Sequence, residues 1–394
     1  MGWETYKLGD ICDFQNGFAF KSKLFSDSGT PILRISNIQN GFVDLKKVAY
    51  TQSDSYKENL EKYKVFPGDL LIAMSGATTG KIGINNTDAI FFLNQRVGKF
   101  SPHEVLDKRY LYFYLSTKVA EHLEVSQGAA QPNLSTEQIK NIEIPLPTIE
   151  EQKRIVAILD EAFADIDKAR ALTERNLENA RELFESYLQY AFTSQDETWT
   201  ENNLGSVCEV SSGGTPKKSN MDYWDGDIPW YSSGELNAIH TCSPNEKITP
   251  LGLKESNAKL FPKGSLLIGM YDTAALKMSI LDRDGAFNQA IAGVKPNQNV
   301  NLEFIRYSIE HIKPSLLKLR RGVRQKNLNQ NKIKGIPVAL PPLDTQNRIV
   351  GQINRVYSSV ENLLTLNETK LTYLESLKKS LLQKAFTGEL TKAA

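Results

Sequence analysis

The chain has 394 residues, of which 24% are charged and 9% aromatic, and its formal net charge is +1 at pH 7. This length predicts two or three domains that each bury a core. A net charge near zero is compatible with local basic patches on the surface. Three scattered cysteines exclude a disulfide framework or a CxxC metal site. No apolar run approaches the roughly 18 residues of a membrane span, so we expect a cytoplasmic protein.

Residues 1–147 are predicted to form a domain rich in strands that also carries helix. Short apolar runs alternate here with Gly, Asn and Pro, which is typical of strands joined by turns. The runs are PILRI at 31–35, DLLIAM at 69–74 and AIFFL at 89–93, and YLYFYLSTKVAEHL at 110–123 has the length of a helix. Pro145 and Pro147 then end the domain.

The stretch IAMSGATTGKIG at 72–83 resembles a phosphate-binding loop without matching one. Such a loop needs four residues between its glycines and a Ser or Thr after its lysine, so that the backbone amides surround the phosphates. Here three residues separate Gly76 from Gly80, and Ile82 follows Lys81. We interpret the stretch as a turn between two strands, in which Lys81 is a candidate contact to a polyanion backbone.

A long helix is predicted at 150–192, where the chain has neither proline nor glycine. Its apolar or small positions recur every three or four residues with one stutter, which is the pattern of a coiled-coil seam. These positions are Ile155, Leu159, Ala162, Ile166, Ala169, Leu172, Leu177, Ala180, Leu183, Tyr187 and Ala191.

The second half of the chain repeats the first at an offset near 195 residues. LGDIC at 8–12 corresponds to LGSVC at 204–208, FPGDLLIAM at 66–74 to FPKGSLLIGM at 261–270, and IPLPTIEEQKRIV at 144–156 to VALPPLDTQNRIV at 338–350. Asn94-Gln95 corresponds to Asn288-Gln289 in the same way. So many collinear matches indicate a tandem duplication. In the second half, the stretch equivalent to 72–83 has Lys277 at the position of Lys81 but no glycine at the positions of Gly76 and Gly80. This argues against a nucleotide-binding phosphate loop in either half.

The seam is duplicated as well, so the second long helix is the natural partner of the first. Adding 194 to each seam position gives Ile349, Ile353, Val356, Val360, Leu363, Leu366, Leu371, Leu374, Leu377, Leu381 and Ala385. The order domain, helix, domain, helix favours antiparallel pairing about a pseudo-two-fold axis. An alternative is that each helix folds back on its own domain. The predicted fold is α+β, with two pseudo-two-fold-related α/β domains at 1–147 and 198–341, separated by two long antiparallel coiled-coil helices at 148–197 and 342–394.

No set of residues in the sequence supports catalysis. The four histidines stand apart, and no HExxH, GxGxxG or GxSxG motif is present. An active site shared by both halves would leave the same polar residues in each, whereas the halves share mainly apolar residues. We therefore expect no catalytic residue, metal ligand or cofactor in this chain.

Charge and amide side chains point to DNA. Residues 311–343 contain no Asp or Glu but eight Lys or Arg, while the equivalent stretch VSQGAAQPNLS at 125–135 is rich in amides. Lys and Arg neutralise phosphates, and Arg, Asn and Gln can bond to base edges. A solvated charged surface is the simpler alternative for the basic run. The predicted DNA-binding residues are Lys21, Arg34, Asn37, Lys81, Asn94, Gln95, Arg96, Gln127, Gln131, Asn133, Thr215, Lys217, Lys218, Ser232, Lys277, Arg320, Arg321, Arg324, Gln325, Lys326 and Asn327.

In its entirety this arrangement resembles the specificity subunit of type I restriction-modification systems. The resemblance rests on LGDIC with NGFAFKS, FPGDLLIAMSG, LNQR, QPNLS and IPLPTIEEQKRIV, then on LGSVC with SGGTPKK, DIPW, FPKGSLLIGM and LPPLDTQNRIV. It implies two target-recognition domains, each recognising one half of an asymmetric bipartite double-stranded DNA site, and a subunit without catalytic activity. It also implies two modification (methyltransferase) subunits that bring S-adenosylmethionine for N6-adenine methylation, and restriction/translocase subunits that bring ATP and Mg.

Two other classes remain open from the residues alone. A duplicated methyltransferase with its own specificity would bind a methyl donor, although the chain lacks the glycine motif for one. A non-catalytic coiled-coil scaffold, whose end domains bind protein partners, would bind its partner independently of DNA.

Overall fold

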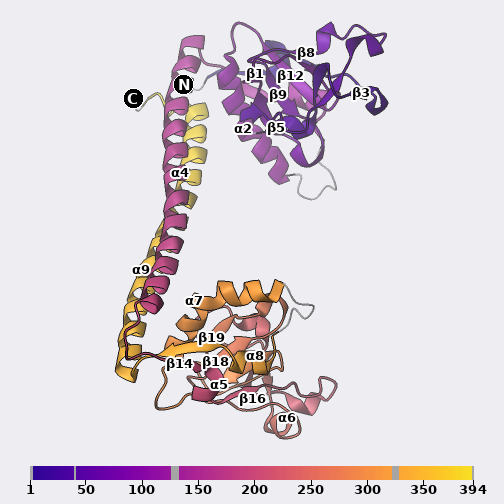
Figure 1. Cartoon of the computed structure of the whole chain (residues 1–394). Coiled ribbons are helices and arrows are strands. Elements are labelled where there is room, and N and C mark those ends of the chain that lie inside the picture. The colour runs from indigo at the N-terminus through magenta and orange to yellow at the C-terminus, as the bar shows by residue number, and fades with distance from the viewer. Residues whose placement is uncertain (1–2, 40, 126–132, 322–327, 393–394) are drawn as a thin grey trace. The chain divides into compact units, whose positions relative to one another are not determined.

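The computed structural model describes residues 3–39, 41–125, 133–321 and 328–392 (Figure 1). The chain divides into two compact units. Unit 1 comprises Met1–Thr173 and Thr369–Ala394, and unit 2 comprises Glu174–Glu368. Each unit therefore contains part of both long helices together with one globular domain.

The described residues of unit 1 form three sheets. The largest has the order β2 (Cys12–Asn16), β12 (Val97–Pro102), β9 (Leu70–Ala73), β10 (Ile82–Ile84), β6 (Gly41–Val43) and β5 (Ile38–Gln39). The second has the order β3 (Phe25–Ser26), β7 (Ala49–Thr51), β4 (Thr30–Leu33), β11 (Phe91–Leu93) and β8 (Lys64–Val65), and β1 (Thr5–Lys7) pairs with β13 (Glu143–Pro145). The helices of this domain are α1 (Leu8–Ile11), α2 (Lys108–Val125) and α3 (Thr136–Lys140).

Unit 2 repeats this plan with fewer strands. Its largest sheet has the order β15 (Val210–Ser212), β21 (Ile291–Val294), β18 (Leu266–Gly269) and β19 (Met278–Ile280). The second has the order β17 (Glu246–Ile248), β16 (Trp224–Tyr231) and β20 (Ala286–Phe287), and β14 (Thr200–Asn203) pairs with β22 (Pro337–Leu340). The helices are α5 (Leu204–Val207), α6 (Pro250–Lys254), α7 (Leu302–Arg321) and α8 (Gln330–Lys334).

The predicted duplication is confirmed by the strand orders. The order β2-β12-β9-β10 in unit 1 matches β15-β21-β18-β19 in unit 2, and β7-β4-β11 matches β17-β16-β20. The pairing directions agree too, because β4 with β11 and β16 with β20 are both parallel. The runs DLLIAM and SLLIGM form β9 and β18, whose residues are all buried, which explains why these strands are continuously apolar instead of alternating.

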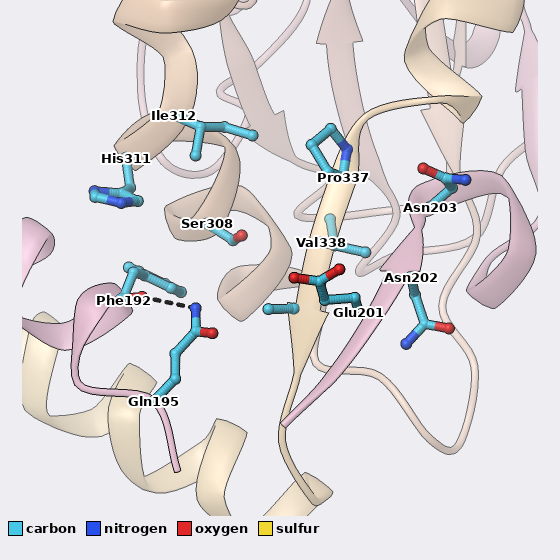
Figure 2. Close-up of a pocket in the computed structure, with 11 residues that line it drawn as sticks. Phe192, Gln195, Glu201, Asn202, Asn203, Ser308, His311, Ile312, Pro337 and Val338 are labelled. Atoms are coloured by element: carbon cyan, nitrogen blue, oxygen red, sulfur yellow. Dashed lines mark hydrogen bonds between the residues drawn. The ribbon is translucent and has the colours of Figure 1, made fainter. Parts of the chain in front are cut away.

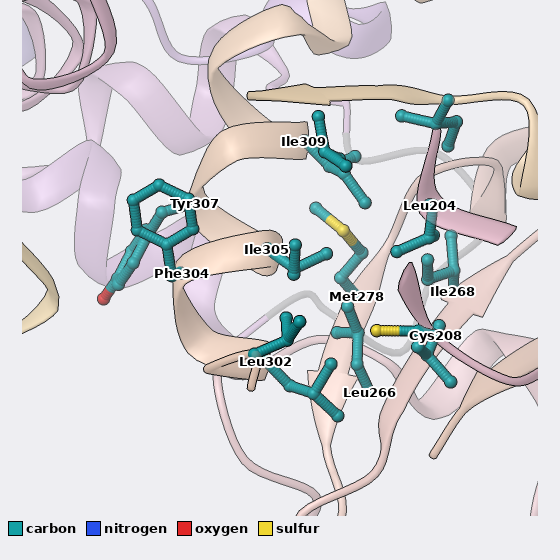
Figure 3. Packing of buried hydrophobic residues seen from close by; sticks show 14 of the residues in the cluster. Leu204, Cys208, Leu266, Ile268, Met278, Leu302, Phe304, Ile305, Tyr307 and Ile309 are labelled. Carbon is teal, nitrogen blue, oxygen red and sulfur yellow. The ribbon is translucent and has the colours of Figure 1, made fainter. Parts of the chain in front are cut away.

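The core of unit 2 lies between its largest sheet and α7 (Figure 3). Leu266 and Ile268 of β18 and Met278 of β19 pack against Leu302, Ile305 and Ile309 of α7. The last turns of α4 (Ile149–Thr193) and the first turns of α9 (Leu343–Thr387) join the same cluster through Leu188, Phe192, Ile349 and Ile353. In unit 1 the equivalent cluster takes in Ile155 and Leu159 of α4 and Ala385 of α9.

The antiparallel pairing of the long helices is confirmed by two ion pairs in unit 1, and the helices are also in contact in unit 2. In unit 1, Arg170 of α4 lies 2.9 Å from Glu375 of α9, and Asp167 pairs with Lys378, so the residue number rises along one helix as it falls along the other. In unit 2, the rings of Phe184 and Tyr357 are 5.4 Å apart.

Part of the predicted seam is wrong. Leu172 and Leu183 of α4 are 51% and 54% exposed, and Leu363, Leu366 and Leu377 of α9 are 43%, 66% and 46% exposed. The protected neighbours are Thr173, Phe184, Leu364, Asn367 and Lys378. One residue corresponds to about 100° of helix rotation, so a leucine one position off the contact stripe points away from the partner helix. Sequence reasoning favoured the leucines because they are apolar, whereas a buried threonine can bond its own helix, as Thr173 does to Ala169.

A buried glutamine joins each long helix to its globular domain. In unit 1, Gln152 is fully buried, donates to the carbonyls of Val105 and Pro147 at 2.9 Å, and accepts from the N–H of Asp107 at 2.8 Å. In unit 2, Gln346 makes the same set of contacts with Asn299, Pro341 and Asn301. Both EEQKRIV and DTQNRIV contain this glutamine. Its presence in both is explained by the three backbone groups to which it hydrogen-bonds in each unit.

Candidate nucleic-acid interface

In unit 1, three predicted residues from distant parts of the sequence meet at one hollow. Gln95 and Arg96 follow β11, and Asn133 precedes α3, and all three line a cavity of about 300 Å³ together with Ser75 and Gly76. Gln95, Arg96 and Asn133 are exposed, so their amide and guanidinium groups are available to a ligand. The side-chain carbonyl of Asn94 accepts from the N–H of Arg96, which shapes the turn.

A second predicted group in unit 1 lies on the loop that follows β4. The guanidinium of Arg34 donates to the carbonyl of Lys47 at 2.9 Å, and its backbone N–H donates to the side chain of Asn37. Asn37 is 1% exposed and also donates to the carbonyl of Asp44, so in this structure it holds the loop from inside. Lys21 is exposed on the loop after β2.

In unit 2, a cavity beside Gln289, the repeat equivalent of Gln95, is otherwise built from other segments of the domain. Thr215 and Gln289 line a cavity of about 670 Å³, together with Asn257 and Lys259 from the segment after α6. The hydroxyl of Thr215 donates to the side-chain carbonyl of Gln289. Ser232 has its N–H and hydroxyl bonded to Glu235, which caps the short turn that follows β16.

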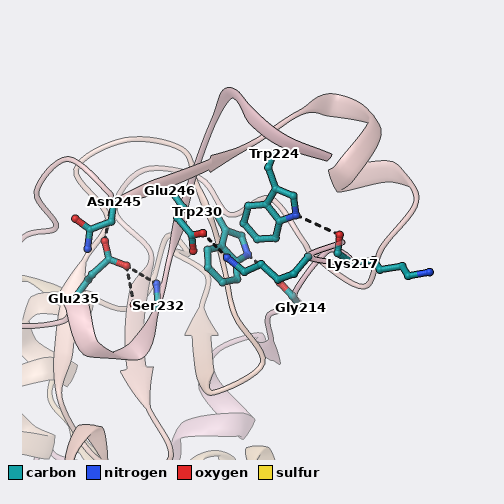
Figure 4. A network of polar contacts seen from close by, with 9 residues as sticks. Gly214, Lys217, Trp224, Trp230, Ser232, Glu235, Asn245 and Glu246 are labelled. Carbon is teal, nitrogen blue, oxygen red and sulfur yellow. Dashed lines mark hydrogen bonds and ion pairs between the residues drawn. The ribbon is translucent and has the colours of Figure 1, made fainter. Parts of the chain in front are cut away.

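The lysine pair in SGGTPKK is held by two tryptophans (Figure 4). Trp230 donates its indole N–H to the carbonyl of Gly214 at 3.0 Å, and Trp224 donates to that of Lys217 at 3.3 Å. The ammonium of Lys218 lies 3.8 Å from the centre of the Trp224 ring and is paired with Glu246. Both tryptophans are buried, and Lys217 remains exposed. The loop is therefore rigid at its base and offers a lysine at its tip.

The remaining predictions fall on residues that the structure does not describe in full. They are Gln127, Gln131, Arg324, Gln325, Lys326 and Asn327, together with the side chains of Arg320 and Arg321 at the end of α7. The amines of Lys81 and Lys277 are described, and each contacts an amide side chain.

Sequence reasoning missed Gln289, Asn257 and Lys259. Gln289 could have been found, because it is the repeat equivalent of Gln95, which was predicted. Asn257 and Lys259 carry no such signal, because they follow α6, which has no equivalent helix in unit 1.

A third cavity, of about 460 Å³, lies where α7, β14, β22 and the end of α4 meet (Figure 2). Ser308 and His311 of α7 face Glu201 of β14 and Val338 of β22 across it. Ser308 is the repeat equivalent of Tyr114 in unit 1, whose ring packs on Phe386 and whose hydroxyl donates to the carbonyl of Glu143. The cavity thus arises because a serine replaces a tyrosine, and we do not assign it a ligand.

His311 in this cavity predicts a pH dependence of stability. Burial lowers the pKa of His311 from its ordinary value of 6.5, and its ring stacks on Phe192. A folded-state pKa below the unfolded one gives a stability contribution that is complete above about pH 6.5 and is lost as pH falls. We expect the urea midpoint to fall between pH 7.5 and 5.5, and to fall less in His311→Asn. An equal fall in both proteins would contradict the assignment.

The described residues show neither a metal-ligand cluster nor a membrane-spanning helix. In the part of the chain that the structure describes, no group of three or more His, Cys, Asp or Glu side chains could hold a metal ion. No described helix has the length and apolar character needed to cross a membrane.

Comparison with protein families gives one match that occurs twice. The model described as "Type I restriction modification DNA specificity domain" matches residues 1–175 and again residues 196–376. The two matches follow the duplication and together cover most of the chain.

Full-length relatives and solved structures agree with this match. The type I restriction enzyme StySPI specificity subunit of Salmonella potsdam is 24% identical, with 99% of this chain and 89% of the relative covered. The EcoKI specificity subunit of Escherichia coli K12 is 22% identical, with 99% and 89% covered. A chain from a structure of a type I R-M system has a TM-score of 0.80 at 20% identity, with 99% and 98% covered. The HsdS subunit from Thermoanaerobacter tengcongensis has a TM-score of 0.65 at 20% identity, with 99% and 97% covered.

Proposed function

The chain belongs to the type I restriction-modification DNA specificity family, and on this premise we propose that it recognises an asymmetric, bipartite DNA site for a type I complex. One domain, at 1–147, would recognise one half-site, and the other, at 198–341, would recognise the second. The segments 148–197 and 342–394 would serve as helical spacers between them.

The observation that carries this proposal is one strand plan that bears two different polar surfaces. Unit 1 presents Gln95, Arg96 and Asn133 around its cavity, whereas unit 2 presents Thr215 and Gln289 with Asn257 and Lys259. Amides and guanidinium groups can form paired hydrogen bonds with purine edges, while lysines contribute to phosphate binding. Different polar groups on equivalent scaffolds would select different sequences, so the two half-sites should be unlike. Apart from Lys81 and Lys277, whose amines donate to amide side chains, the residues predicted from the sequence remain our candidates for DNA contact.

We further propose that the chain itself is not catalytic and acts by positioning partner subunits in the cytoplasm. Two modification (methyltransferase) subunits would supply S-adenosylmethionine chemistry, and restriction/translocase subunits would supply ATP- and Mg-dependent steps. Exposed apolar side chains on the long helices, including Leu172, Leu183, Leu363 and Leu366, offer surfaces on which such subunits could bury area. These leucines point away from the helix pair, which leaves them free for a partner.

The test is to map N6-methyladenine in DNA from cells that express this chain with its methyltransferase subunit. We expect one bipartite motif with unlike halves, which disappears when this chain is deleted. Exchanging residues 198–341 for those of a relative with another target should change one half of the motif and leave the other half unchanged. Methylation that persists after deletion would refute the proposal and favour a scaffold whose end domains bind protein.

A further inference from the structure

A lysine–amide pair occurs at equivalent places in the two units. In unit 1, the amine of Lys81 donates to the side-chain carbonyl of Gln39 at 2.9 Å. In unit 2, the amine of Lys277 donates to the side-chain carbonyl of Asn237 at 2.8 Å. Each lysine directly precedes the second strand of a hairpin, β10 or β19. Each amide lies on a segment that is distant in sequence, Gln39 at the end of β5 and Asn237 after β16.

The amide of each pair is oriented by a second hydrogen bond. The NH2 group of Gln39 donates to the carbonyl of Ser36 at 3.2 Å, and that of Asn237 donates to the carbonyl of Gly234 at 2.7 Å. In both units the acceptor is three residues earlier in the chain. The side-chain carbonyl is therefore directed at the lysine, so that the lysine bond restrains the loop as well as the amide.

Lys81 and Lys277 each follow a turn of the same backbone geometry, although the residues that form the turn differ between the units. The preceding residue has a left-handed backbone in each, with φ of 83° at Gly80 and 58° at Leu276. A leucine in this conformation is strained, because its Cβ crowds the following carbonyl. The carbonyl of each lysine also accepts a strand N–H, at 2.9 Å for Lys81 and 2.8 Å for Lys277. Unit 2 therefore retains the turn geometry even though Leu276 stands where unit 1 has Gly80, which adopts this conformation without strain.

The segments that carry the amides also contain residues that the sequence predicts to bind DNA. We define the recognition loops as residues 34–39 in unit 1 and 232–237 in unit 2, which include the candidates Arg34 and Ser232. The two loop sequences differ, and so do the lengths of the amide side chains, yet the contact to the lysine is the same.

Resting on the proposed function, we propose that Lys81 and Lys277 are positioning residues for specificity. Each holds the recognition loop of its own unit through Gln39 or Asn237, and neither acts chiefly as a phosphate contact. This revises the role in polyanion binding that the sequence suggested for both lysines. Lys81 would influence the half-site recognised by its own unit and not the other.

A lysine that contacts phosphate and a lysine that positions a loop predict different effects of substitution on DNA binding. Loss of a phosphate contact weakens binding to all sequences and lowers the slope of log Kd against log salt by about 0.9. Loss of a positioning contact lowers discrimination against mismatches in one half-site and leaves that slope unchanged. Substitution of Gln39 separates the roles further, because it removes the contact and leaves the lysine charge in place.

The experiment uses the complex of the full chain with its methyltransferase subunits, after methylation mapping of the unaltered protein has given the motif. Affinity is measured for the cognate site and for single mismatches in each half, over a range of salt concentrations. The variants are Lys81→Met, Gln39→Met, the double variant and Lys277→Met. We expect Lys81→Met and Gln39→Met each to lower discrimination in one half-site about tenfold, the scale of one net hydrogen bond, with the salt slope unchanged. The double variant should lose no more than either single one.

Lys277→Met should affect the other half-site and thus serves as the matched control. A normal affinity pattern in Gln39→Met, or a uniform loss with a smaller salt slope in Lys81→Met, would overturn the proposal. If Lys81→Met does not fold, Gln39→Met decides the question. Failure of the proposed function is distinguishable, since the unaltered complex would then show no bipartite motif at all.

Discussion

Replacing Gln152 by methionine is expected to lower the free energy of unfolding of unit 1 by about 3 kcal/mol, since it leaves one buried and two partly buried backbone groups without their partner. Methionine has a similar shape and length, so the loss would come from unsatisfied polar groups and not from a cavity. Gln346→Met should have the same effect on unit 2, because its side chain makes the equivalent three contacts.

The measurement is the urea midpoint of the far-UV circular dichroism signal. Lys153→Met is the matched control, because Lys153 is exposed and adjacent to Gln152 on α4. We expect the control to unfold within about 0.5 kcal/mol of the unaltered chain. Equal midpoints for Gln152→Met and Lys153→Met would show that these three hydrogen bonds do not join the helix to its domain.

Alanine at Gly17 or Gly213 is expected to displace the loop that carries the lysine and threonine candidates for DNA contact. A Cβ at Gly17 would lie 2.2 Å from the carbonyl oxygen of Leu93, and one at Gly213 would lie 2.0 Å from that of Phe287. Both contacts are with backbone, which cannot rotate away as a side chain would. Each glycine follows the first strand of its largest sheet, where the loop crosses the Asn-Gln turn.

We expect each variant to lose about 1–3 kcal/mol of stability, the usual cost of overpacking, and at least tenfold in affinity for cognate DNA. Gly351→Ala is the control, since a Cβ there meets nothing within 4 Å and alanine favours the interior of α9. The control should be as stable as the unaltered chain or more so. Full cognate affinity in both Gly17→Ala and Gly213→Ala would mean that these loops are not part of the DNA interface.

The sequence was sufficient for features that arise from repetition and from local patterns. The duplication, the buried strands at 70–73 and 266–269, and the two long helices were all predicted, because collinear matches and apolar runs are properties of the chain itself. The near match to a phosphate-binding loop was resolved in the same way, since Lys277 persists without the glycines.

Which side chains face a partner was decided by the tertiary structure. The sequence assigned Leu172 and Leu366 to the helix seam, yet Thr173 and Asn367 are the buried residues, because the contact stripe is fixed by the partner helix and not by apolarity alone. Asn37 was predicted to bind DNA from its residue type, but its side-chain amide bonds within its own loop.

Lys81 and Lys277 also show what the sequence predicts and what only the tertiary structure decides. Their place after a turn was visible in the sequence, whereas Gln39 and Asn237, which lie about 40 residues away, could not be identified as their acceptors. A contact between distant segments depends on how strands pair and loops fold back, and one sequence does not specify that pairing residue by residue. The sequence by itself therefore determined the family, the duplication and the element types, and the tertiary structure decided which polar groups are exposed and which hold the loops in place.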